Sequence, residues 1–220
     1  MDGSAVPATM VRPLLRGVLH HVAFWIALAA GGVLIAEANG TQKRLAAVVF
    51  ATSVIVCFGI SALYHRVWWR PSVRVWMRRA DHAGVYLLIA GTYTPVALLA
   101  LRGEWRPAVL GVVWAGAVVA IAVKFVWIGA PRWLGASLGL LLGWIAVVAL
   151  PELVRNLDGA ALALLIVGGL AYTAGALVYA RGRPDPVPAV FGYHELFHAL
   201  TIVGVTCQYT AIAFFVLNQA

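Results

Sequence analysis

Long apolar segments alternate with short polar stretches along the whole chain. Each segment is close to the roughly 20 residues that a helix needs to cross the hydrocarbon core of a bilayer. The apolar residues are continuous, not alternating, which favours helices over strands, because lipid forces backbone groups to hydrogen-bond within the segment. The predicted spans are His20–Ala38, Leu45–Tyr64, His82–Leu101, Ala108–Trp127, Leu134–Leu150, Ala160–Ala180 and Tyr193–Leu217.

These seven spans predict an all-α polytopic membrane protein, a seven-transmembrane helix bundle in a single domain over residues 1–220. Residues 1–17 form a short N-terminal segment before the first span. A cleaved signal peptide is the alternative for the first apolar run, but similar runs follow it and it is long enough to cross, so we expect an uncleaved span. With 63% hydrophobic and only 11% charged residues, the composition excludes an ordinary water-soluble domain.

The net charge of +8 comes mostly from basic residues in the short loops. There, Lys and Arg suit anionic lipid headgroups and set the orientation of the chain, so we expect membrane lipids and no nucleic acid as partners. Ten arginines fall on the side of the N-terminus and five basic residues on the other side. This bias predicts a multi-pass protein of the cell membrane with a cytoplasmic N-terminus. Lys124, near the end of the fourth span, is expected to snorkel toward the same side.

Ionisable residues inside membrane spans are costly and are therefore functional candidates. In the predicted topology, the end of the second span and the beginnings of the third and seventh lie at one depth, close to the cytoplasmic interface. Scattered polar residues would have no reason to share that depth. The polar residues at these three places are Ser61 and His65, Asp81 and His82, and His194 and His198.

A zinc site can be built from these residues. His194 and His198 are four residues apart, so they project from one face of a helix, as the histidines of H-E-x-x-H motifs do. His65 would supply a third nitrogen, and three histidines with an open fourth position are typical of catalytic zinc, whose bound water has a pKa of about 7. Asp81 can accept a hydrogen bond from that water or orient an imidazole, and Ser61 can bind the water or a substrate carbonyl.

Each of these residues also has a purely structural interpretation. A histidine pair at this spacing arises by chance in many helices, and His65 can hydrogen-bond a carbonyl at the interface. Asp81 can pair with Arg78 or Arg79, or cap the third helix. Ser61 can hydrogen-bond back within its own helix.

Neighbouring polar residues are interpreted as structural. His20 and His21 open the first span and are expected to anchor it at the interface, and His82 faces a different direction from the aspartate before it. Glu195 is expected to be solvated or paired with an arginine. Residues 66–79 are interpreted as an amphipathic loop on the surface of the membrane.

Three motifs in the chain resemble the haemolysin III branch of the progestin and adipoQ receptor family. They are Ser61–His65 (SALYH), Asp81-His82 followed by Tyr86–Pro95 (YLLIAGTYTP), and His194–His198 (HELFH). The resemblance extends from the second span to the seventh. It implies a seven-helix bundle with a cytoplasmic N-terminus in a bacterial-type inner membrane.

The resemblance also implies zinc on His65, His194 and His198, with Asp81 and Ser61 near the metal-bound water. Alkaline ceramidases belong to the wider superfamily, so the implied chemistry is hydrolysis of a lipid amide or ester. The bacterial branch is named for haemolysis, and the alternative function is a pore-forming or receptor-like membrane protein with a structural zinc.

The chain departs from the family pattern at two places. Pro13 and Arg16 stand where the family often has Glu and Asn before a histidine of the first span, and Gln208 stands where it often has a further histidine. None of these positions is among the three expected zinc ligands.

Overall fold

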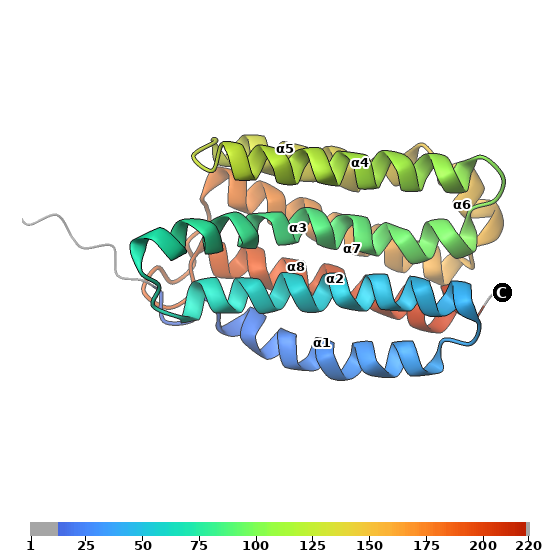
Figure 1. Cartoon of the computed structure of the whole chain (residues 1–220), viewed down its shortest axis with the longest axis horizontal. Helices are drawn as coiled ribbons and strands as arrows, with labels where there is room; N and C mark the ends of the chain where they lie inside the picture. The colour runs from blue at the N-terminus through green and yellow to red at the C-terminus, as the bar shows by residue number, and fades with distance from the viewer. Residues whose placement is uncertain (1–12, 219–220) are drawn as a thin grey trace, which may run out of the picture.

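The computed structural model describes residues 13–218 and is all-helical over that range (Figure 1). Helices run side by side along the length of the bundle, and the beginning of the first helix and the C-terminus lie at opposite ends. The α-helices are α1 (Val18–Glu37), α2 (Thr41–Arg66), α3 (Pro71–Ala100), α4 (Trp105–Val126), α5 (Arg132–Gly143), α6 (Leu150–Asn156), α7 (Gly159–Arg181) and α8 (Tyr193–Ala211). A 3-10 turn, η1 (Ile145–Val147), follows α5, and a π turn, η2 (Ile212–Val216), continues α8.

Six helices of the described chain are long and apolar enough to cross a membrane, and a bent helix pair can form a seventh span. Their outward faces carry large apolar side chains, such as Val118 and Val119 of α4, which are 61% and 60% exposed. Such surfaces suit lipid and not water. The prediction of a polytopic membrane bundle is therefore confirmed, while its orientation in the membrane stays a prediction.

The fifth predicted span is broken. A continuous helix over Leu134–Leu150 was wrong, because α5 ends at Gly143 and the chain bends by 52° before α6. Tyr93 of α3 stabilises the passage from α5 to η1: its hydroxyl donates to the carbonyl of Gly143 at 2.6 Å and accepts from the N–H of Ala146 at 2.9 Å. Backbone groups freed from a helix at membrane depth need such partners.

The third helix begins eleven residues before the predicted span. It starts at Pro71, where proline suits the first helical position, and runs without interruption through the arginine-rich stretch. Residues 71–79 are therefore part of α3, and the place of residues 66–79 at the membrane surface stays a prediction. Asp81 lies well inside α3 and does not cap it.

Small residues let α2 and α3 approach closely. A methyl group on Gly91 would overlap the side chain of Ser53, and one on Gly84 would come within 3.3 Å of the Cα atom of Cys57. Close approach through small residues is the usual way in which helices pack in a membrane. It aligns the end of α2 with the first half of α3. We call the end of the bundle where α2 and α7 finish and α3 and α8 begin the histidine end.

Candidate metal centre

The start of α8 carries two buried histidines. The helix begins at Tyr193, and the Glu195 side chain accepts a hydrogen bond from the N–H of Gly192 at 3.0 Å, which satisfies a backbone donor at the start of the helix. His194 and His198 follow one turn apart, are 9% and 2% exposed, and point to the same side. The local sequence thus fixes where α8 starts, and with it the direction of both imidazoles.

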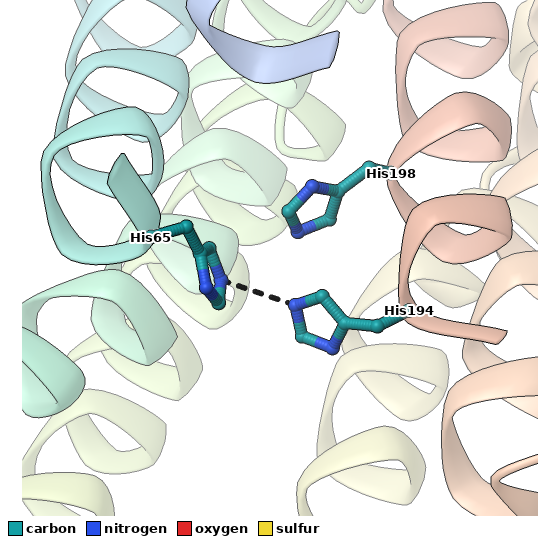
Figure 2. Close-up of side chains that lie close together, drawn as sticks. All are labelled: His65, His194 and His198. Atoms are coloured by element: carbon teal, nitrogen blue, oxygen red, sulfur yellow. Dashed lines mark hydrogen bonds between the residues drawn. The ribbon is translucent and has the colours of Figure 1, made fainter. Parts of the chain in front are cut away.

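The last turn of α2 supplies the third histidine. His65 is 7% exposed, and its Nε2 atom lies 3.1 Å from Nε2 of His194. One ring nitrogen from each of His65, His194 and His198 lies within 4.8 Å of the others (Figure 2). We call these three residues the histidine cluster. The structure brings together the three residues that the sequence predicts as metal ligands.

The histidine cluster fits a metal ion. Zinc–nitrogen bonds of about 2.0–2.1 Å in a tetrahedral site place two ligand nitrogens about 3.3 Å apart. The 3.1 Å between His65 and His194 is close to that separation, and a ring nitrogen of His198 lies within 4.8 Å of both. Imidazole nitrogens suit zinc and several other transition metals. The geometry is therefore compatible with a metal without deciding which one.

Asp81 and Ser61 lie beside the cluster. The Oδ2 atom of Asp81 is 3.8 Å from Nε2 of His65, and the residue is 9% exposed. Within residues 13–218, Asp81 forms no ion pair with an arginine, and the buried hydroxyl of Ser61 makes no hydrogen bond back to its own helix. The alternative interpretations, an arginine pair for Asp81 and a back-bond for Ser61, are thus wrong. Both side chains face the cavity described below.

His20 belongs to this region, although the sequence interpretation placed it at the interface. It is 3% exposed, and its ring stacks on that of His198 with centroids 3.7 Å apart and planes 8° apart. His21 is exposed, and its role as an interfacial anchor stays a prediction. Adjacent helical residues point about 100° apart, so one of two neighbouring histidines can face the interior while the other faces outward, as His20 and His21 do.

The segment before α1 covers the histidine end. Leu14 and Leu15 donate backbone hydrogen bonds to the carbonyls of Ala189 and Val190, at 3.0 and 3.1 Å. The next residue, Arg16, pairs with Glu195, which is fully buried. The expected arginine partner of Glu195 is confirmed and the solvated alternative is wrong. This contact ties the N-terminal segment to the helix that carries two of the three histidines.

A cavity of about 90 Å³ opens beside the cluster, with Ser61, Asp81, His194 and His198 in its wall. It shares wall residues with a larger apolar cavity of about 220 Å³ between α3, α5, α7 and α8. Together they approach the lower end of the size range of small-molecule sites. The shared residues are Val85, Gly139, Ala176, Phe197 and Thr201.

Gln208 lies away from the cluster. It lines the larger cavity, and its side-chain amide donates to the carbonyl of Leu165 at 3.2 Å. Ten residues of helix, about 15 Å, separate it from His198. The departure from the family pattern at this position therefore leaves the candidate ligands intact.

Comparison with known proteins places the chain among membrane proteins of related length. The haemolysin-III related family model matches residues 8–209. The chain is 29% identical over 212 residues to Hemolysin-3 of Bacillus cereus, covering 94% of this chain and 93% of that protein. It is 25% identical over 210 residues to the Hemolysin-3 homolog of Bacillus subtilis, covering 94% and 95%. It is 34% identical over 182 residues to the heptahelical transmembrane protein ADIPOR2 of Oryza sativa subsp. japonica, covering 74% and 79%.

Proposed function

Because this chain belongs to the haemolysin-III related family, within the progestin and adipoQ receptor family, we propose that it is a zinc-dependent membrane hydrolase of a lipid amide or ester. The observation that carries the proposal is the arrangement of the histidine cluster. Three buried ring nitrogens lie within 4.8 Å of one another, and a carboxylate, Asp81, stands just outside them at 3.8 Å from His65.

Each residue has a role in this reaction. His65, His194 and His198 would hold zinc, which when bound polarises a carbonyl and lowers the pKa of water to about 7. Asp81 is placed to accept a proton from the attacking water and return it to the leaving amine or alcohol. Ser61, whose buried hydroxyl shares the cavity wall with Asp81, can donate a hydrogen bond to the carbonyl oxygen.

The cavities support a lipid as the substrate. The larger one is walled mainly by apolar side chains of α3, α5, α7 and α8 and shares wall residues with the smaller cavity beside the cluster. An acyl chain in that cavity would bring its carbonyl to the histidines. Three histidine ligands would leave the fourth position of a tetrahedral zinc ion open for the carbonyl or for water. Structural zinc sites, in contrast, usually have four protein ligands.

Lipidomics on the purified, zinc-loaded protein tests the proposal. The wild type should consume an amide- or ester-linked lipid and release a fatty acid, and Asp81→Asn should lower the rate by about 100- to 10,000-fold, the usual contribution of a general base. Asp158→Asn is the matched control, because Asp158 caps α7 at the opposite end and asparagine caps helices equally well. Equal rates in the wild type and Asp81→Asn, or no lipid consumed by the zinc-loaded wild type, would contradict the proposal.

The printed name of the Bacillus cereus relative favours a second candidate, lysis of membranes with a structural zinc. The two candidates make opposite predictions for Asp81→Asn, which keeps the three histidines. Lysis of liposomes that survives this substitution favours the pore, whereas loss of both lysis and lipid cleavage favours the hydrolase.

We also propose that the histidine end faces the cytoplasm. The excess of arginine on that side of the predicted topology supports this orientation. A cysteine introduced at the exposed Ser72, near the start of α3, should resist a membrane-impermeant thiol reagent in intact cells and react after lysis. Labelling in intact cells would reverse the orientation.

A further inference from the structure

Lys124 is buried at the histidine end, in the last turn of α4. The side chain was expected to snorkel to the membrane surface, but its residue is only 5% exposed and it lines the smaller cavity together with Asp81, His194 and His198. The expectation was wrong because α5 and α3 enclose the end of α4. A primary amine therefore shares a cavity with the candidate metal centre.

No carboxylate of residues 13–218 neutralises this ammonium group. Seven of the eight acidic residues are described, and four of these lie at the opposite end of the bundle. Of the other three, Glu195 pairs with Arg16, Asp185 accepts the N–H of Tyr193 at 2.7 Å, and Asp81 lies 3.8 Å from His65. Unpaired charge in a membrane protein is costly, so such a residue is a functional candidate whose partner must be sought.

The surroundings of Lys124 leave room for its amino group. A methyl group on Gly135 of α5 would lie 2.7 Å from Nζ of Lys124 and 3.5 Å from the hydroxyl of Tyr86. Tyr86 holds this part of α5 in place by donating to the Gly135 carbonyl at 3.1 Å. The absence of a side chain on Gly135 thus provides the space in which the ammonium group lies. Within residues 13–218, Lys124 donates no hydrogen bond to another protein group.

We propose that Lys124 binds an anionic oxygen group, a carboxylate or a phosphate, of an amphiphile whose chain lies in the adjoining apolar cavity. A charge-assisted hydrogen bond to such a group would supply the missing countercharge. The two sources of that chemistry are the fatty-acid product and a phosphate headgroup. The first of them rests on the proposed function, because hydrolysis of an amide or ester by water yields the carboxylate and the amine or alcohol.

Binding of three probes with the same alkyl chain tests this site: hexadecanoate, hexadecyl phosphate and hexadecanol. In phosphatidylcholine nanodiscs, we expect the wild type to bind at least one anion on the order of tenfold more tightly than the alcohol. Lys124→Gln should remove that preference, and Lys43→Gln, at the chain's other lysine at the opposite end, should keep it. The anion with the larger Lys124-dependent preference identifies the source. An equal preference in Lys124→Gln and the wild type would overturn the proposal.

Two further variants guard the test. If Lys124→Gln does not fold, Gly135→Ala keeps the charge but places a methyl group against it, and should weaken anion binding several-fold with alcohol binding unchanged. His194→Ala should retain the preference for the anion even though it disables the candidate metal centre. If the wild type has no hydrolase activity but still prefers the anion to the alcohol, the proposed function is contradicted and the anion site at Lys124 is supported. If His194→Ala loses the preference for the anion while Lys124→Gln keeps it, the anion binds at the metal centre and the proposed site at Lys124 is rejected.

Discussion

Replacing His194 by alanine gives a direct measure of the histidine cluster. The substitution removes one of three ring nitrogens and leaves His65 and His198, whose nitrogens lie within 4.8 Å of each other. Residues that only orient a metal ligand change affinity by about 10- to 100-fold, so loss of a ligand itself should cost about 100-fold or more. We expect about one zinc per wild-type chain and far less than one in His194→Ala.

The same loss has a consequence for stability. A wild type held at a zinc concentration of about 100 times its Kd gains about 2.7 kcal/mol from the metal, and after a 100-fold loss of affinity the gain falls to about 0.4 kcal/mol. A chelator should therefore lower the thermal midpoint of the wild type clearly and that of His194→Ala hardly at all.

Metal analysis and thermal unfolding with and without chelator measure both effects. His21→Ala is the matched control, since His21 is exposed at the same end of the bundle and outside the cluster. Full zinc content and an unchanged chelator response in His194→Ala would refute the ligand assignment.

Three further substitutions test the packing around the site, each by the free energy of unfolding in mild detergent. Glu195→Gln should lower the free energy of unfolding by about 1–3 kcal/mol. This loss is smaller than for a fully buried ion pair, because the partner Arg16 is 21% exposed; an unchanged free energy would mean that the pair is solvated. Gly91→Ala should cost about 1–3 kcal/mol, because the new methyl overlaps Ser53 and must separate α2 from α3; a neutral result would show that the helices can move apart freely. Tyr93→Phe should cost about 1–3 kcal/mol by leaving the backbone at the helix break unpaired; wild-type stability would mean that another group satisfies the break.

The histidine cluster could be predicted because the amino-acid sequence indicates both which residues share a helix face and how deep they lie in the membrane. The spacing of His194 and His198 fixes a common face, and the ends of apolar runs place His65 at the same depth. Periodicity alone cannot say which way α2 and α8 are rotated, so the contact between them depended on the packing of the whole bundle.

The features that were missed depend on contacts between distant segments. The apolar run of the fifth span gives no sign of a break, which the hydroxyl of Tyr93 stabilises from another helix. Polar residues near the end of a span look alike whether they reach headgroups or the interior. Thus His20 and Lys124 were both assigned to the surface, and only the neighbouring helices bury them.

The hydrogen bond between His65 and His194 joins residues 129 positions apart in the sequence. Two of the three cluster histidines are on α8, which leaves the ribosome after α1–α7, so a nascent chain has a single one until α8 is made. Loading of any metal that the cluster holds is therefore a late event in biogenesis, and a chain truncated before α8 should enter the bilayer without being able to retain the ion.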